Sequence, residues 1–259
     1  MSKTKLNKKL FEKFTANFPK NFRLPKTEIE RRIFAEYGAL FVARGGATPP
    51  ERVVFRSERE VSNFQTGVEA SKLKIGDFEI ELQTAAMKKL KKAVKEAEEN
   101  DLTITPRASD SARRNYRETV GLWASRVNPA LIHWTKEGKL SEIEAEKISS
   151  LSPQKQITEV LRHEENEIFF SKDLKKSILY SVAPPGASQH LSMLALDVNE
   201  YEDERVIKIL AKHFWYQTVV SDLPHFTFLG VPENDLPDLN LKRTETGDGR
   251  VFWTPNLKT

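Results

Sequence analysis

The stretch FEIELQTAAMKKLKKAVKEAEEND, residues 78–101, contains both kinds of secondary structure that we expect in this chain. It begins as a strand and continues as a helix, because apolar residues then recur at helical spacing. One face of this segment is apolar and is formed by Leu82, Ala86, Leu90, Ala93 and Ala97. The lysines that lie off this face are Lys88, Lys91, Lys92 and Lys95. The stretch therefore predicts a fold that combines strands with amphipathic helices.

Segments on both sides extend this pattern. A helix is expected from Thr27, which forms a capping-box pattern with Glu30, and Gly45–Gly46 would end it. Further helices are predicted over 111–163 and 203–217. Strands are predicted over 177–183, 194–200, 218–231 and the tail 247–255, and the segment 51–65 begins as a strand. We expect one α+β domain over residues 26–259, preceded by a basic, loop-like arm at residues 1–25.

The composition limits the chemistry that is available. The chain has 259 residues, of which 39% are hydrophobic and 30% charged, as in ordinary globular proteins. It has no cysteine, so disulfides, thiolate zinc sites and cysteine nucleophiles are excluded. A metal site must therefore be built from Asp, Glu and the five histidines, which are His133, His163, His190, His213 and His225.

Charge and the N-terminal sequence bear on partners and location. The net charge of +4 suits an anionic partner such as a cell-wall polymer, and no nucleic-acid-binding motif is present. No apolar run is long enough to span a bilayer, and the start lacks the apolar core of a signal peptide. We expect a periplasmic or extracellular protein if a signal peptide has been removed, and a cytoplasmic one otherwise. The oligomeric state is left open.

Polar residues that could bind a metal stand out in three segments. The run PGASQHLSMLALD, residues 185–197, places His190 seven positions before Asp197. The segment DLPHF carries Asp222 and His225, and Arg107 follows a predicted strand. A hydrolytic zinc site needs three protein ligands, an open position for water and a nearby base. The spacing alone favours a hydrogen-bonded core histidine over a metal ligand, because a histidine beside apolar residues is usually part of the core.

The order of these segments resembles the VanY-type zinc D,D-carboxypeptidases. TPRASDSARRNY, PGASQHLSMLALDV and DLPHFTFLG match the arginine, Ser-x-His-x6-Asp and acidic-x-x-His-Phe elements of that family, within roughly residues 80–231. Matching positions in the middle element are Ser188, His190, Ala195 and Asp197. The last element is matched by His225, Phe226 and Gly230.

The resemblance implies a compact antiparallel sheet with helices and a zinc ion bound by His190, Asp197 and His225. It also implies Asp222 as general base, Arg107 as the residue that binds substrate and stabilises the tetrahedral intermediate, and Ser188 as a substrate-side hydrogen-bonding residue. The implied substrates are D-Ala-D-Ala termini or other bonds of peptidoglycan stem peptides.

The chain departs from the family at several positions. The family usually has Glu at the position of the general base, whereas this chain has Asp222. An aspartate followed by Pro-His-Phe is more similar to the related L-Ala-D-Glu endopeptidases of phages. The family's glycine is replaced by Met193, so the backbone there need not be left-handed. A helical insertion is predicted at about 117–176. The charged neighbours Asp110, Arg113 and Arg114 are interpreted as a surface ion network, one member of which could support Arg107.

Two classes of function follow. The first is a zinc metallopeptidase, either a D,D-carboxypeptidase or an L-Ala-D-Glu-type endopeptidase. The second is a non-catalytic module that binds the cell wall on the same fold. Cleavage of muropeptides, with and without a chelator, distinguishes the two classes.

Overall fold

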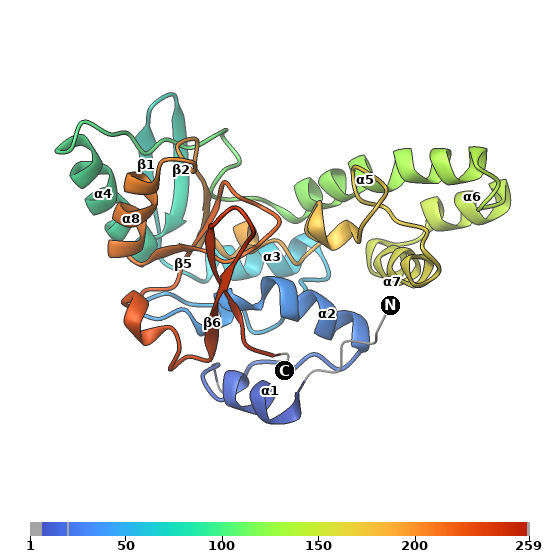
Figure 1. The fold of residues 1–259 in the computed structure, drawn as a ribbon, viewed down its shortest axis with the longest axis horizontal. Helices are drawn as coiled ribbons and strands as arrows, with labels where there is room; N and C mark the ends of the chain where they lie inside the picture. The colour runs from blue at the N-terminus through green and yellow to red at the C-terminus, as the bar shows by residue number, and fades with distance from the viewer. Residues whose placement is uncertain (1–6, 20, 258–259) are drawn as a thin grey trace.

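The computed structural model describes residues 7–19 and 21–257, and its fold is α+β (Figure 1). The helices are α1 (Lys8–Thr15), α2 (Glu28–Tyr37), α3 (Glu58–Thr66), α4 (Thr84–Glu98), α5 (Tyr116–Lys136), α6 (Glu142–Ser150), α7 (Pro153–His163) and α8 (Glu204–Lys212). The strands are β1 (Ala70–Ile75), β2 (Phe78–Gln83), β3 (Ala195–Asp197), β4 (Trp215–Gln217), β5 (His225–Phe228), β6 (Leu241–Glu245) and β7 (Val251–Pro255).

The strands form small antiparallel sheets. A three-stranded sheet has the order β3-β5-β4, while β1 pairs with β2 and β6 pairs with β7. Helices α4 and α8 pack on each other beside the β1–β2 hairpin (Figure 1). The apolar face predicted over residues 82–97 is buried in the core under these elements. The expectation of small antiparallel sheets flanked by helices is therefore confirmed.

The N-terminal segment packs in the core, and the expectation of a loop-like arm is wrong for Lys8–Thr15, which form α1. Residues 16–19 and 21–25 are turns and loop, with an isolated β-bridge at Arg23. Asn7 caps α1 by accepting a hydrogen bond from the backbone N–H of Leu10. Phe14 in this helix is fully buried and lies 5.6 Å, centroid to centroid, from Phe34 of α2. Helix α1 was not predicted from the sequence because its apolar residues alternate with several lysines. Residues 1–6 of the predicted arm lie outside the described residues.

The helices predicted at about 117–176 are present as α5, α6 and α7, which extend to one side of the molecule (Figure 1). Asn115 and Glu118 form a capping box at the start of α5, with the side chain of each accepting a hydrogen bond from the backbone N–H of the other. Pro129 stands inside the helix.

Several predicted boundaries differ. The helix from Thr27 has the expected capping box, but α2 ends at Tyr37 and a 3₁₀ helix, η1 (Gly38–Val42), follows. Residues 177–183 form a 3₁₀ helix, η3 (Ile178–Tyr180), in place of a strand. The segment 51–65 becomes helical after Ser57, whose side chain accepts the N–H of Glu60. None of the helices in the described ranges is both long and apolar enough to cross a bilayer.

Candidate metal centre

The structure brings His190, Asp197 and His225 together from three elements. His190 lies in a short 3₁₀ helix, η4 (Gln189–Ser192), directly before β3. Asp197 ends β3 and is paired with His225, the first residue of β5, in the antiparallel ladder. Directly paired residues of an antiparallel sheet project to the same face. The pairing therefore places one carboxylate and one imidazole side by side, and η4 adds the second imidazole.

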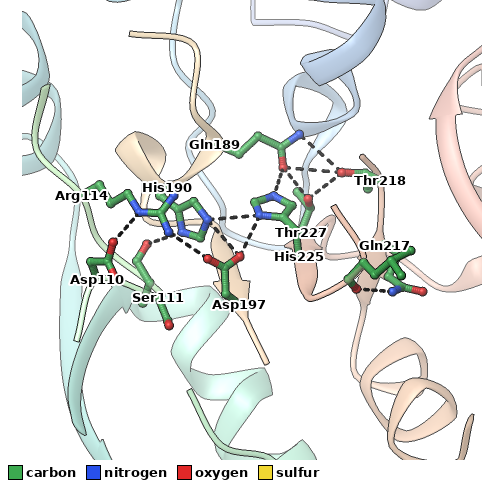
Figure 2. A network of polar contacts seen from close by, with 12 residues as sticks. Asp110, Ser111, Arg114, Gln189, His190, Asp197, Gln217, Thr218, His225 and Thr227 are labelled. Atoms are coloured by element: carbon green, nitrogen blue, oxygen red, sulfur yellow. Dashed lines mark hydrogen bonds and ion pairs between the residues drawn. The ribbon is translucent and has the colours of Figure 1, made fainter. Parts of the chain in front are cut away.

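The three side chains converge on one point (Figure 2). The distance from His225 Nδ1 to His190 Nε2 is 3.1 Å. Asp197 Oδ1 lies 3.2 Å from His225 Nδ1 and 3.2 Å from His190 Nε2. Both imidazoles are buried, and the side chain of Asp197 is 14% exposed. The donor atoms form a nearly equilateral triangle.

Hydrogen bonds at the outer nitrogens fix the tautomer of each histidine. His190 Nδ1 lies 3.3 Å from the carbonyl oxygen of Ala112, which can only accept. His225 Nε2 lies 3.0 Å from Gln189 Oε1. The orientation of that amide is set in turn, because Gln189 Nε2 donates to the carbonyl of Tyr37 at 3.0 Å. Both outer nitrogens therefore carry hydrogen, and in the neutral form of each imidazole the inner nitrogen carries a lone pair.

The charge state of the triangle follows from its surroundings. Burial lowers the pKa of His190, the charge of Asp197 raises it, and the charge of Arg114 lowers it again, with a net shift below the usual value. Burial opposes ionisation of Asp197, but its interactions with His190 and His225 hold its pKa well below the usual value. When both imidazoles are neutral, two lone pairs and a carboxylate oxygen face one point, which is an arrangement that can bind a metal ion.

The spacing of the donor atoms fits a small metal ion. Zinc binds nitrogen and oxygen ligands at about 2.0–2.1 Å in tetrahedral geometry, which separates neighbouring donor atoms by about 3.3–3.4 Å. The observed separations of 3.1–3.2 Å are close to this value. The group can therefore hold a metal ion, and two imidazoles with one carboxylate are a donor set that zinc accepts.

Arg114 is the arginine in contact with this group. Its Nη2 lies 2.9 Å from Asp197 Oδ2, and its Nε lies 3.1 Å from Asp110 Oδ2 (Figure 2). This ion pair occupies the outer oxygen of Asp197 and leaves Oδ1 to face the histidines. Arg114 was assigned to a surface network, whereas its side chain is only 15% exposed. The one sequence feature that could have indicated a buried position for Arg114 was its place immediately before Asn115, the N-cap of α5.

Arg107 takes a different position. Its backbone N–H donates to the carbonyl of Asp197 at 3.2 Å, so the segment before α5 runs along β3. The side chain is exposed, and its guanidinium lies over the ring of Tyr201, 5.6 Å from the centroid. Arg107 does not line the cavity next to His190 and His225. Its predicted role at the substrate stays a prediction.

A cavity of about 280 Å³ opens onto the group formed by His190, Asp197 and His225. His190, His225 and Arg114 line it, together with Ser188 and Asp222. Asp222 is exposed, and its carbonyl accepts the N–H of His225 at 3.2 Å, so this turn links the predicted base to a predicted ligand. Tyr37 also lines the cavity, and burial followed by the charges of Glu36 and Asp222 raises its pKa well above the usual value.

The backbone at Met193 is left-handed, as it would be at the glycine of the family pattern. Met193 has φ 55° and ψ 32°, a left-handed conformation, although its side chain is buried. Its N–H donates to the carbonyl of His190 at 3.2 Å, which closes η4 before β3 begins. The turn between the two predicted ligands therefore requires the left-handed residue, and methionine adopts it here because packing holds its side chain in the core.

No protein-family model matches the chain, and neither does any curated protein or solved structure. The resemblance to VanY-type enzymes therefore depends on the quoted motifs and on the site that they form.

Proposed function

We propose that the chain is a zinc-dependent peptidase that hydrolyses D-Ala-D-Ala termini of peptidoglycan stem peptides. The observation that carries the proposal is the convergence of two imidazoles and one carboxylate beside a cavity that Asp222 also lines. A divalent ion held by His190, Asp197 and His225 supplies a Lewis acid and lowers the pKa of water.

The residues of the chain have distinct tasks in this reaction. Asp222 accepts the proton of the attacking water on its carboxylate and passes it to the leaving amine. Arg114 lines the cavity next to Asp197, and in this proposal its guanidinium stabilises the negative charge that develops on the substrate carbonyl. Ser188 is buried at the cavity wall, where its hydroxyl is available to the peptide backbone.

The position of Asp222 supports its assignment as a base better than as a ligand. It does not belong to the group whose donor atoms all lie within 4.8 Å of one another. It nevertheless lines the same cavity, from the turn that precedes His225. A general base must lie within reach of the water and need not contact the metal.

The test is mass spectrometry of muropeptides incubated with the zinc-loaded protein, with and without a chelator, combined with elemental analysis of bound metal. We expect loss of a single terminal D-Ala, abolished by the chelator and by His190→Ala. The matched control is His133→Ala, which removes a histidine of α5 outside the metal-binding group and is expected to keep both zinc and activity.

The other outcomes separate the alternatives. Cleavage inside the stem identifies an endopeptidase. Bound zinc without any cleavage supports the non-catalytic module. Full activity in His190→Ala contradicts the proposed metal centre.

A further inference from the structure

One face of α5 forms a wall of the cavity. Thr119, Leu122 and Arg126 line it, and their spacing of three and four residues places them on the same side of the helix. Arg114, which immediately precedes the capped start of α5, contacts Asp197. The helix therefore begins at the metal centre, and Arg126 stands about 10 Å further along its axis than Thr119, at about 1.5 Å per residue.

The guanidinium of Arg126 is held by neutral groups. Its Nε donates to Ser181 Oγ at 3.1 Å, and its Nη1 donates to Ser125 Oγ at 2.9 Å. Over residues 7–19 and 21–257, no Asp or Glu oxygen pairs with Arg126 within 4.0 Å. Arg114, by contrast, is paired with both Asp110 and Asp197. Arg126 thus brings an uncompensated positive charge to the cavity.

The surroundings of Arg126 favour binding of an anion. Ser181 Oγ also accepts the backbone N–H of Lys172 at 3.1 Å, so the hydroxyl that orients Arg126 is itself fixed. Leu122, one turn before Arg126, and Val182, next to Ser181, add apolar wall. A planar guanidinium that is already oriented binds a carboxylate through paired, charge-assisted hydrogen bonds.

We propose that Arg126 binds a carboxylate of the peptide substrate and thereby selects acidic peptides; this rests on the proposed peptidase function. In a stem peptide the bound carboxylate is either the terminal carboxylate or that of an acidic residue within the stem.

The experiment uses the zinc-loaded full chain and three versions of the peptide L-Ala-γ-D-Glu-L-Lys-D-Ala-D-Ala. One is unmodified, one has an amidated C-terminus and one has an amidated D-Glu. Arg126→Gln is expected to raise KM for the unmodified peptide about 10- to 100-fold, as for loss of a charge-assisted hydrogen bond, with kcat within about twofold. Arg126→Lys is expected to recover part of the loss. Arg117→Gln, on the same helix but outside the cavity lining, is the control and should match the wild type.

The amidated peptides identify the carboxylate. Amidation of the recognised group should raise KM in the wild type but not in Arg126→Gln. Turnover with KM unchanged by Arg126→Gln for all three peptides overturns this inference and leaves the peptidase proposal intact.

If the wild type cleaves none of the peptides, the peptidase proposal fails, and calorimetric binding of the unmodified peptide to the metal-free protein decides the inference. Weaker binding by Arg126→Gln than by Arg117→Gln supports a carboxylate site at Arg126. Equal binding by the two variants contradicts it.

Discussion

The ion pair between Arg114 and Asp197 gives a prediction whose magnitude follows from the structure. Substitution Arg114→Met keeps most of the aliphatic stem and removes the guanidinium, so the outer oxygen of Asp197 loses its partner. The two side chains are 15% and 14% exposed, and Nη2 lies 2.9 Å from Oδ2. Removal of one partner from a fully buried ion pair costs about 3–5 kcal/mol. Because water still reaches this pair, we expect a loss of about 2–3 kcal/mol in the free energy of unfolding.

The assay is thermal and urea unfolding in the presence of a chelator. For a chain of this size, about 1 kcal/mol shifts Tm by about 2–4 °C, so Arg114→Met should lower Tm by about 4–12 °C. With saturating zinc the loss should shrink, because the ion gives the Asp197 carboxylate a second positive partner. An equal or larger loss with zinc would mean that Arg114 acts mainly by orienting Asp197.

The control is Arg107→Met. The guanidinium of Arg107 is exposed and contacts the ring of Tyr201, so its loss should change the free energy of unfolding by no more than about 0.5–1 kcal/mol. Similar losses in Arg107→Met and Arg114→Met, with or without zinc, would refute the assignment of Arg114 as the arginine that supports the metal centre.

Two further predictions concern stability away from the metal centre. Phe14→Ala should destabilise the protein by about 3–5 kcal/mol in urea unfolding, because Phe14 is fully buried among other phenylalanines; a loss under about 1 kcal/mol would restore the view of this segment as a detachable arm. Burial raises the pKa of Glu164. The hydrogen bonds that its carboxylate accepts from Ser177 and Ile178, and its ion pair with Arg32, oppose this shift without cancelling it. The folded state therefore binds this proton more tightly than the unfolded state does. The wild type should therefore lose stability relative to Glu164→Gln as the pH rises from 4.5 to 7.5, and a relative gain would show that the pair with Arg32 outweighs burial.

Local signals in the sequence were sufficient for much of the secondary structure. Helical spacing over residues 82–97 and the Thr27–Glu30 capping box both depend on residues within a few positions of one another, so they can be read without knowledge of the fold. They failed where an apolar face was mixed with many lysines, as in α1, and where a short apolar run formed a 3₁₀ helix, as in η3.

The candidate site divides in the same way. The absence of cysteine and the small number of histidines restricted the possible ligands, and the motif order indicated His190, Asp197 and His225. Only the tertiary structure decided which arginine reaches Asp197, since Arg114 and Asp197 are 83 positions apart in the chain. It also showed that Gln189 fixes the tautomer of His225, that Met193 is left-handed, and that α5 lines the cavity. These features depend on contacts between segments that are distant in the sequence. They therefore cannot be predicted from the neighbouring residues in the chain.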